Sequence, residues 1–315
     1  MSNDQGVLLR QMRQALQSSD YPQAIHTLEQ LIELARTSGN IGMAGRHLGN
    51  LALIYYRINQ PQQALDHFAQ ALECARQDHD QFTESGVLGN IGNILRETKR
   101  YPEALNYLQQ ALDIAQRVDD VRGRGIWLSN LGLVYDDMHE PQHALELHQQ
   151  SVEIARQLQD QRGLAARLAN LGNTYIALGD LTQALESFEA SIVVYDQLGD
   201  AHELALKLGI IGNVYSEIGR TEENQDAAFA ALDRALRYYN RSLRLIQSLG
   251  DSASEAELLR SIGNTLANRG QYDDAIRSFE QAITVFESIN VFGPVKDLRR
   301  SIRMVEQYKA RYTSS

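Results

Sequence analysis

The sequence predicts an all-α solenoid of about seven stacked helix pairs, followed by a C-terminal capping helix. The first observation is an internal repeat with a period of 40 residues. Its clearest copies begin at Leu48, Leu88, Leu128 and Leu168. Second, apolar residues follow each other at helical spacing, as at Leu171, Tyr175 and Leu178. Third, the helix formers Ala, Leu and Gln dominate, whereas there are only 5 prolines.

Each repeat is predicted to hold two helices joined by a short turn such as "NQP", "KRYP" or "GD". We expect repeats at residues 7–40, 41–80, 81–120, 121–160, 161–200, 201–251 and 252–291. The array would thus occupy residues 1–291, and residues 292–315 would form the capping helix and tail. Because one helix pair cannot bury its apolar face alone, the repeats must stack on one another.

Particular residues justify the helix boundaries and the close pairing. An aspartate ends successive repeats and suits the N-cap of the next helix: Asp80, Asp120, Asp160 and Asp200. Asp200 with Glu203, and Ser252 with Glu255, have the spacing of capping boxes. Small residues on the first helix would let it approach the recurring alanine of the second: Ala52, Gly92, Gly132, Gly172, Gly212 and Gly263.

Two segments depart from the repeat. The stretch from Gly219 to Asp251 is 11 residues longer than its counterpart from Gly179 to Asp200. Since 11 residues make almost three helical turns, the stretch "NQDAAFAALDRALRYYNRSL" could be one long helix; the alternative is an extra turn at "TEENQD". The second departure is a helical pattern over residues 295–311 with six basic and two acidic residues, which we interpret as a capping helix with a solvated outer face.

The repeat "LANLGNTYIALGDLTQALESFEASI" resembles the tetratricopeptide repeat, in the 40-residue form of the Pins/LGN and kinesin light chain families. The shared pattern is Leu171, Gly172, Tyr175, Ala184 and Phe188, and the resemblance covers residues 7–291. It implies a right-handed solenoid whose first helices line a concave groove. It also implies that asparagines in this groove bind extended peptides.

The composition excludes several classes of protein. A formal net charge of −10 argues against a nucleic-acid binder, because phosphate contacts require dense Lys and Arg. The single cysteine, Cys74, excludes a disulfide framework, and no apolar run approaches ~18 residues. We therefore expect a cytoplasmic protein without membrane contact.

The stretch "HEPQH" at residues 139–143 matches the H-E-x-x-H zinc motif, but the repeat register places it in the turn of the fourth repeat. Pro141 would disrupt a helix that carried both His139 and His143. We interpret the match as a turn and expect no metal, no cofactor and no enzymatic activity. His148 occupies the position of Phe68 and Phe188 in other repeats and is expected to be buried.

Asparagine recurs at two positions of the predicted first helices, although it is a mediocre helix former. The first position carries Asn50, Asn90, Asn130 and Asn170, and the second, three residues later, carries Asn93, Asn173, Asn213 and Asn264. Two interpretations remain open. The amides either make structural hydrogen bonds to the adjoining repeat or form a ladder that grips the backbone of a bound peptide. An amide offers both a donor and an acceptor, as a peptide bond does.

Charged residues beside the asparagines would set the specificity. They are Arg46, Arg57, Arg96, Glu97, Asp136, Asp137, Glu217, Glu257 and Arg260. Their mixed signs do not select one class of ligand. The N-terminal end of the groove is expected to be basic, because it holds Arg10, Arg13, Arg46 and Arg57. An acidic residue of the ligand would bind there.

The leading hypothesis is a non-catalytic scaffold or adaptor that binds an extended peptide or partner segment. One alternative is a regulatory sensor of a small signalling peptide. A DNA-binding output is not expected for such a sensor, because only residues 1–6 precede the first repeat. Another alternative is a structural assembly element; the sequence allows a homo-oligomer without indicating one.

Overall fold

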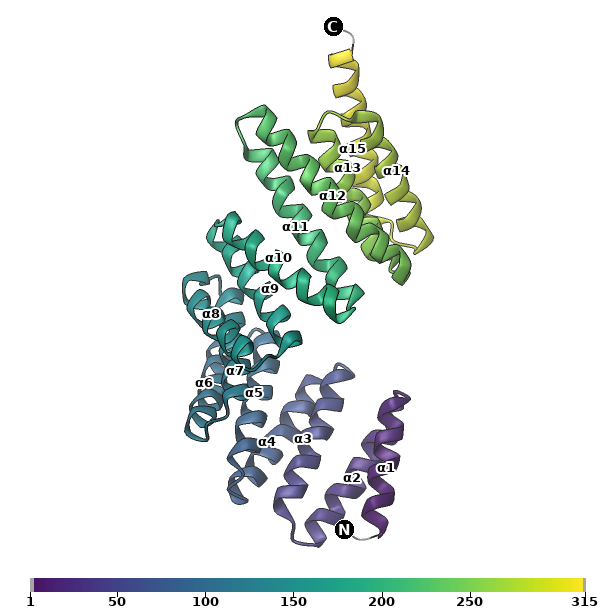
Figure 1. The fold of residues 1–315 in the computed structure, drawn as a ribbon. Coiled ribbons are helices and arrows are strands. Elements are labelled where there is room, and N and C mark those ends of the chain that lie inside the picture. The colour runs from purple at the N-terminus through teal and green to yellow at the C-terminus, as the bar shows by residue number, and fades with distance from the viewer. Residues whose placement is uncertain (1–2, 314–315) are drawn as a thin grey trace. The chain divides into compact units, whose positions relative to one another are not determined.

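The computed structural model describes residues 3–313, and it describes the side chains of residues 5–311. Within this range the chain forms fifteen α-helices and no β-strand (Figure 1). In chain order they are α1 (Asn3–Gln17), α2 (Tyr21–Thr37), α3 (Ile41–Arg57), α4 (Pro61–Gln77), α5 (Gln81–Glu97), α6 (Tyr101–Arg117), α7 (Val121–Asp137), α8 (Pro141–Gln157), α9 (Gln161–Leu178), α10 (Leu181–Leu198), α11 (Ala201–Thr221), α12 (Gln225–Leu249), α13 (Ser252–Asn268), α14 (Tyr272–Ser288) and α15 (Gly293–Thr313). The predicted all-α arrangement of repeated helix pairs is confirmed.

The chain forms two compact units, Met1–Gln159 and Asp160–Ser315. We call them unit 1 and unit 2 and describe each by itself. In unit 1 the odd-numbered helices α3, α5 and α7 are the first helices of their pairs, and in unit 2 the first helices are α9, α11 and α13. The repeat pattern predicted one continuous array and gave no sign of this division.

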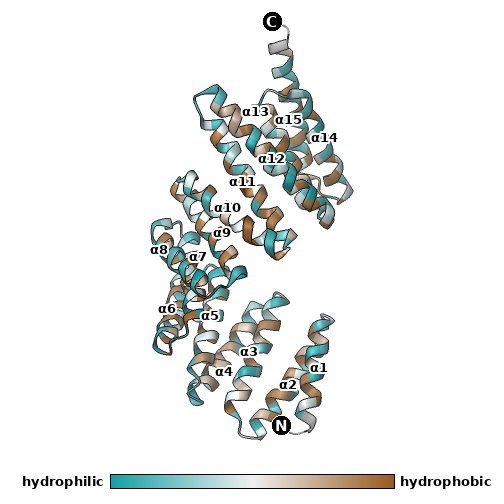
Figure 2. Ribbon diagram, viewed as in Figure 1, coloured by the Kyte–Doolittle hydropathy of each residue, from teal (hydrophilic) through white to brown (hydrophobic). Residues whose placement is uncertain are grey.

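Apolar side chains hold the pairs together, and hydropathy colouring shows them recurring among polar residues along the same helices (Figure 2). The core of unit 1 includes the fully buried Leu28, Leu88 and Leu108, and that of unit 2 includes Phe188 and Phe279. Among the described residues, no helix is both long enough and apolar enough to cross a bilayer.

The glycines of the first helices permit the close pairing that the sequence predicted, with a different contact from the one expected. A methyl group on Gly172 would lie 2.8 Å from Cε2 of Phe188, and one on Gly92 would lie 2.6 Å from Cγ of Leu108. Each glycine thus faces the large residue four positions after the recurring alanine, more closely than the alanine itself. Any side chain there would push the two helices apart.

The aspartate N-caps are confirmed. An oxygen of Asp80 accepts a hydrogen bond of 3.0 Å from the N–H of Thr83, and Asp120, Asp160 and Asp200 cap α7, α9 and α11 in the same way. Asp200 accepts from the N–H of Glu203 at 3.3 Å, which is one half of the predicted capping box. The box predicted at Ser252 is wrong. Asp251 caps α13 by accepting from the N–H of Ser254 at 3.1 Å, so Ser252 is already the first helical residue.

Both helices of the α11–α12 pair share the 11-residue insertion. Helix α12 has 25 residues and α11 has 21, whereas α10 has 18. Of the two alternatives that the sequence left open, the structure has the long helix, with Asn224 as its N-cap. Gly219 does not end its helix as Gly179 does; it lies inside α11, where an added methyl would be 2.6 Å from Cγ of Leu232. This contact extends the close packing of the pair beyond Gly212.

Helix α15 covers the end of unit 2. It packs on α14 and buries Val295, Leu298 and Val305. Its basic residues are partly paired with α14, because Arg299 contacts Glu287 at 3.0 Å and Lys309 forms an ion pair with Asp273. The predicted helical pattern over residues 295–311 lies within this helix.

Candidate functional site

The predicted asparagines all lie on first helices. In unit 1, Asn50 lies on α3, Asn90 and Asn93 on α5, and Asn130 on α7. Asn90, Asn93 and Asn130 are half-buried, and Asn50 is exposed. We call the surface that these helices form the first-helix face of unit 1.

Unit 2 has its own first-helix face, formed by α9, α11 and α13. Asn170 and Asn173 lie on α9, Asn213 on α11 and Asn264 on α13. Asn170 is half-buried, and the other three are exposed. At the two remaining positions of the first row stand Ile210 and Ser261, so the amide row is interrupted here.

Hydrogen bonding separates these amides into two groups. Asn213 accepts a bond of 2.7 Å from the hydroxyl of Tyr239 on the second helix of its own pair, which is a structural role. Within the described part of the chain, no side-chain hydrogen bond holds six of the others: Asn50, Asn90, Asn93, Asn130, Asn173 and Asn264. Those six amides are available to a ligand or to water.

Three of the six amides share one pocket in unit 1. Asn90, Asn93 and Asn130 line a cavity of about 150 Å³. Its other lining residues are Leu53, Tyr56, Phe68, Ile94, Arg96 and Glu97. The pocket therefore combines apolar walls with amides from two neighbouring first helices, α5 and α7. Sequence reasoning assigned Phe68 to the core and did not single out Tyr56. The residue type at the position of Tyr56 differs from repeat to repeat, so only contacts between repeats reveal its place in the pocket.

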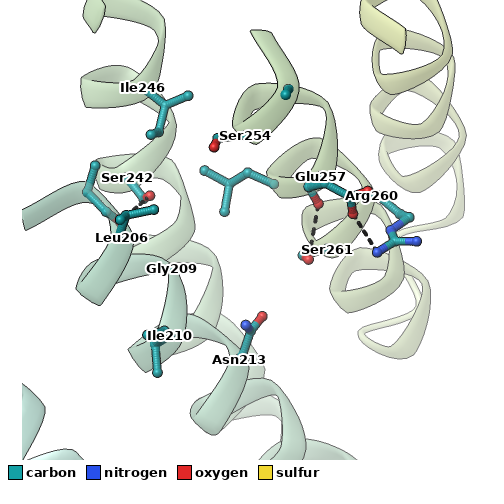
Figure 3. A pocket seen from close by; sticks show the side chains of 13 residues that line it. Leu206, Gly209, Ile210, Asn213, Ser242, Ile246, Ser254, Glu257, Arg260 and Ser261 are labelled. Atoms are coloured by element: carbon teal, nitrogen blue, oxygen red, sulfur yellow. Dashed lines mark hydrogen bonds and ion pairs between the residues drawn. The ribbon is translucent and has the colours of Figure 1, made fainter. Parts of the chain in front are cut away.

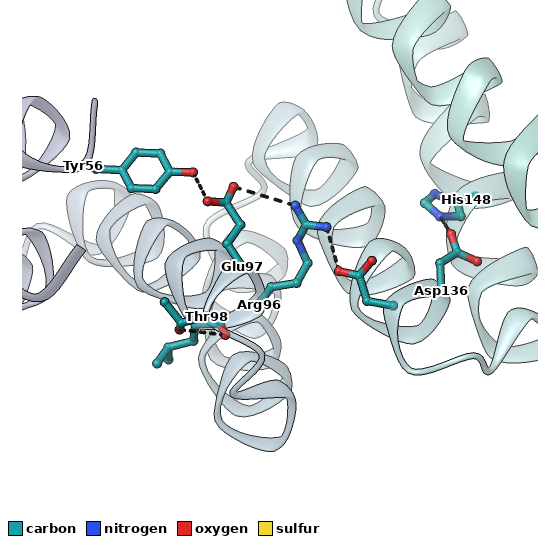
Figure 4. A network of polar contacts seen from close by, with 8 residues as sticks. Tyr56, Arg96, Glu97, Thr98, Asp136 and His148 are labelled. Carbon is teal, nitrogen blue, oxygen red and sulfur yellow. Dashed lines mark hydrogen bonds and ion pairs between the residues drawn. The ribbon is translucent and has the colours of Figure 1, made fainter. Parts of the chain in front are cut away.

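A polar network joins three successive first helices at the edge of this pocket (Figure 4). The hydroxyl of Tyr56 on α3 donates to Glu97 on α5, and Nη1 of Arg96 lies 2.9 Å from Oδ2 of Asp137 on α7. Burial, together with the hydrogen bond to Glu97, raises the pKa of Tyr56 to about 12. The phenol therefore stays protonated and donates its hydrogen bond throughout the physiological range.

Several of the charged residues expected to set specificity are paired within the chain. Nη1 of Arg46 lies 3.0 Å from Oδ2 of Asp80, and Arg260 lies 2.5 Å from Glu257. Asp136 binds the ring of His148, and Glu217 binds Arg220. Such pairing reduces the number of free charges that the sequence predicted for the groove. Arg57, by contrast, is exposed and forms no ion pair within the described residues.

The first-helix face of unit 2 holds a larger cavity of about 450 Å³ between α11, α12 and α13 (Figure 3). Leu206, Ile210 and Ile246 form an apolar side, and α13 supplies polar groups opposite them. Asn213 lies at one end of the cavity.

The zinc-like motif lies in a turn, as the sequence predicted. His139 has a left-handed backbone with φ of 61° just after α7, and Pro141 begins α8. His143 contacts Glu140 at 3.0 Å, and no group of three or more potential metal ligands occurs among the described residues. His148 is fully buried, with Nε2 3.0 Å from Oδ2 of Asp136, which confirms its predicted core position.

Cys74 is half-buried, and burial raises the pKa of its thiol.

Comparison with known proteins identifies the class. The sequence profile of the tetratricopeptide repeat family matches residues 14–77, 84–157 and 230–288, and a second profile of this family matches residues 165–192. The chain therefore belongs to the tetratricopeptide repeat family, whose fold is typical of protein-interaction modules. A comparison with curated proteins found no match.

Three solved structures illustrate the likeness of the fold. A STAND protein with a tetratricopeptide repeat sensor from Pyrococcus horikoshii is similar with a TM-score of 0.73 and 13% identity, over 98% of this chain and 50% of that one. This chain thus spans half the length of that relative. A Rap protein complexed with Competence and Sporulation Factor is similar with a TM-score of 0.51 and 17% identity, over 99% of each chain. A putative kinesin light chain from Podosopora anserina has a TM-score of 0.52 and 18% identity, over 64% of this chain and 100% of that one.

Proposed function

We propose that this protein is a non-catalytic adaptor that holds an extended segment of a partner protein against its first-helix faces through asparagine amides. The observation that carries the proposal is the pocket of unit 1, where the amides of Asn90, Asn93 and Asn130 converge without side-chain hydrogen bonds of their own. Asparagine is a mediocre helix former, so solubility alone does not explain why it recurs on the surface of these helices.

The chemistry of the amide fits a peptide backbone. Each amide can accept from one backbone N–H and donate to one backbone C=O. Packed helices lie about 8–10 Å apart, and an extended peptide advances about 3.3 Å per residue, so amides on neighbouring first helices would meet the ligand every few residues. Because they bind the backbone, these contacts would tolerate many ligand sequences.

The expected energy of these contacts is modest and measurable. A neutral hydrogen bond contributes about 0.5–1.5 kcal/mol net, so loss of the bonds made by two amides should weaken binding by roughly tenfold or more. Apolar contacts with Leu53 and the ring of Tyr56 and the polar edge at Glu97 would supply the remaining affinity and some specificity.

A library of random dodecapeptides displayed on phage provides the test. Peptides selected on the full chain are synthesised, and their dissociation constants are measured by fluorescence anisotropy. The double variant Asn90→Ala/Asn130→Ala should bind at least about tenfold more weakly. Asn106→Ala serves as the matched control, since this exposed asparagine lies on the second helix α6. Equal affinity of all three proteins would refute the amide mechanism, and failure to enrich any peptide would refute the function.

The similarity over 99% of each chain to a Rap protein complexed with Competence and Sporulation Factor favours a second candidate function, a sensor of a small signalling peptide. A sensor changes its conformational population when it binds, whereas a static adaptor does not. Small-angle scattering with and without a selected peptide distinguishes them. A smaller radius of gyration in the complex supports the sensor, and an unchanged scattering profile supports the adaptor.

A further inference from the structure

The cavity of unit 2 is an unfilled position of the repeat. It lies between α11 and α13, with Ser242 and Ile246 of α12 also lining it, and its volume is about 450 Å³. Pockets that bind organic ligands commonly measure about 300–1,000 Å³. Figure 3 shows Leu206, Ile210 and Ile246 on one side of the space and α13 on the other.

The chain itself shows what fits such a position. In the repeat register Gly89 of unit 1 corresponds to Gly209 of unit 2, and Trp127 corresponds to Leu258. In unit 1 the indole of Trp127 covers Gly89 so closely that an added methyl would lie 2.2 Å from Cζ3. Trp127 is only 8% exposed, so the aromatic ring fills the position completely.

In unit 2 the corresponding side chain is too short to do the same. A methyl on Gly209 would lie 3.9 Å from Cδ1 of Leu258 and 3.7 Å from Oγ of Ser242, which is ordinary contact distance. Gly89 is buried, whereas Gly209 remains partly exposed. The shorter Leu258, at the position where unit 1 has Trp127, therefore leaves the space beside Gly209 open to a ligand.

The serine that accepts a hydrogen bond from the indole in unit 1, Ser85, has a counterpart in unit 2, Ser242. In unit 1, Nε1 of Trp127 donates to Oγ of Ser85 at 2.9 Å, and this oxygen also bridges to the second helix by donating to the carbonyl of Ala111. In unit 2 the serine stands on the second helix, and Oγ of Ser242 donates to the carbonyl of Ala205 at 2.7 Å. The hydroxyl of Ser242 keeps its acceptor lone pairs for a donor in the cavity.

We infer that this cavity receives one aromatic side chain of a bound segment, a ring that carries a hydrogen-bond donor, with Leu206, Ile210 and Leu258 around the ring and Ser242 accepting its N–H or O–H. The inference rests on the proposed function, because it makes this side chain part of the segment that the first-helix face holds. It adds specificity that the backbone contacts of the amides do not supply. Polar groups of Ser254, Glu257 and Ser261 lie at the opposite side, where the ligand backbone would run.

The test uses a small probe, N-acetyl-5-fluorotryptophanamide, titrated with the full chain and followed by fluorine NMR. Leu258→Trp reproduces the arrangement at Trp127 and should weaken binding of the probe at least about tenfold. Val193→Trp is the matched control, because it adds a tryptophan at a 55% exposed site of α10 in the same unit and should leave the affinity unchanged. N-acetylalaninamide should not displace the probe.

Equal binding of the probe to wild type and Leu258→Trp, or no binding to wild type, would overturn the inference. Circular dichroism verifies that the variant is folded. If it is not, nuclear Overhauser effects between the probe and the methyl groups of Ile210 and Ile246 decide instead, and their absence overturns the inference. The unit 1 variant Asn90→Ala/Asn130→Ala should still bind the probe. Failure of the cavity is therefore distinguishable from failure of the amide mechanism.

Discussion

Substitution of Gly172 by alanine tests whether the close approach of paired helices depends on the missing side chain. The new methyl would lie 2.8–2.9 Å from Cε2, Cδ2 and Cζ of Phe188, a ring that is fully buried and has no free space to move into. Overpacking a core costs about 1–3 kcal/mol, and three ring atoms in conflict place this site at the upper end. Alanine returns about 1 kcal/mol of helix propensity. We expect a net loss of about 2 kcal/mol in the free energy of unfolding.

Urea unfolding followed by circular dichroism measures this loss. Gly209→Ala is the matched control within the same unit, since its methyl meets only atoms at 3.7 and 3.9 Å and should stabilise the helix by about 1 kcal/mol. In the background of Phe188→Ala, which truncates the side chain that the new methyl would meet, Gly172→Ala should lose most of its cost, and a double-mutant cycle reports this coupling. If Gly172→Ala unfolds at the same urea concentration as Gly209→Ala, the packing argument is refuted.

Three further predictions concern charges, phenols and metal. The N–H of Thr83 lowers the pKa of Asp80, so the cap contributes its full stability above the unfolded pKa of about 3.9 and loses it as the pH falls through the lower folded pKa. Asp80→Ala should therefore lower the free energy of unfolding by about 1 kcal/mol at pH 7 and by much less at pH 3, as measured by urea titration. Burial raises the pKa of four tyrosines from 10.0 to about 12, so four phenols should ionise late in an absorbance titration, and Tyr→Phe variants identify which ones. Because the unfolded chain loses these protons first, the free energy of unfolding should fall as the pH rises from 10 towards 12. The four tyrosines are Tyr56, Tyr195, Tyr238 and Tyr239. His139→Asn keeps a residue suited to the left-handed backbone, as Asn59 is at the equivalent position. This variant and treatment with EDTA should both leave the melting temperature unchanged, and stoichiometric zinc in the purified protein would contradict the interpretation of the motif as a turn.

Helix boundaries could be predicted from the sequence wherever the side chain of a single residue caps the helix. Asp80 ends a repeat and caps the next helix, because its carboxylate reaches an N–H three residues on without help from the rest of the fold. The error at Ser252 has the same local nature. Two adjacent residues, Asp251 and Ser252, can both cap, and the position of the preceding turn at Gly250 selects the first.

The insertion shows where local reasoning stops. The spacing of apolar residues in the insertion allowed either one long helix or an extra turn. The sequence did not indicate how the 11 inserted residues are shared between two helices. The division follows from packing, since Gly219 of α11 lies against Leu232 of α12 and the two antiparallel helices must lengthen together to keep that contact.

The rows of asparagine could be predicted from the sequence because they share the period of the repeat. The surroundings of each amide could not. The ion pair between Arg96 and Asp137 joins residues 41 positions apart, and the contact of Trp127 with Gly89 depends on the stacking of neighbouring repeats. Sequence reasoning therefore overestimated the free charge beside the amides and missed the cavity at Gly209.

By itself, the sequence determined the all-α class, the pairing of helices, the caps and the face on which the amides lie, since each depends on residue types at a fixed spacing along one helix or one pair. Only the tertiary structure decided which amides are free, which charges neutralise one another and where a cavity remains. Those properties depend on side chains from different repeats meeting in space. Leu258 in one repeat and Trp127 in another give different surroundings without disturbing the repeat pattern.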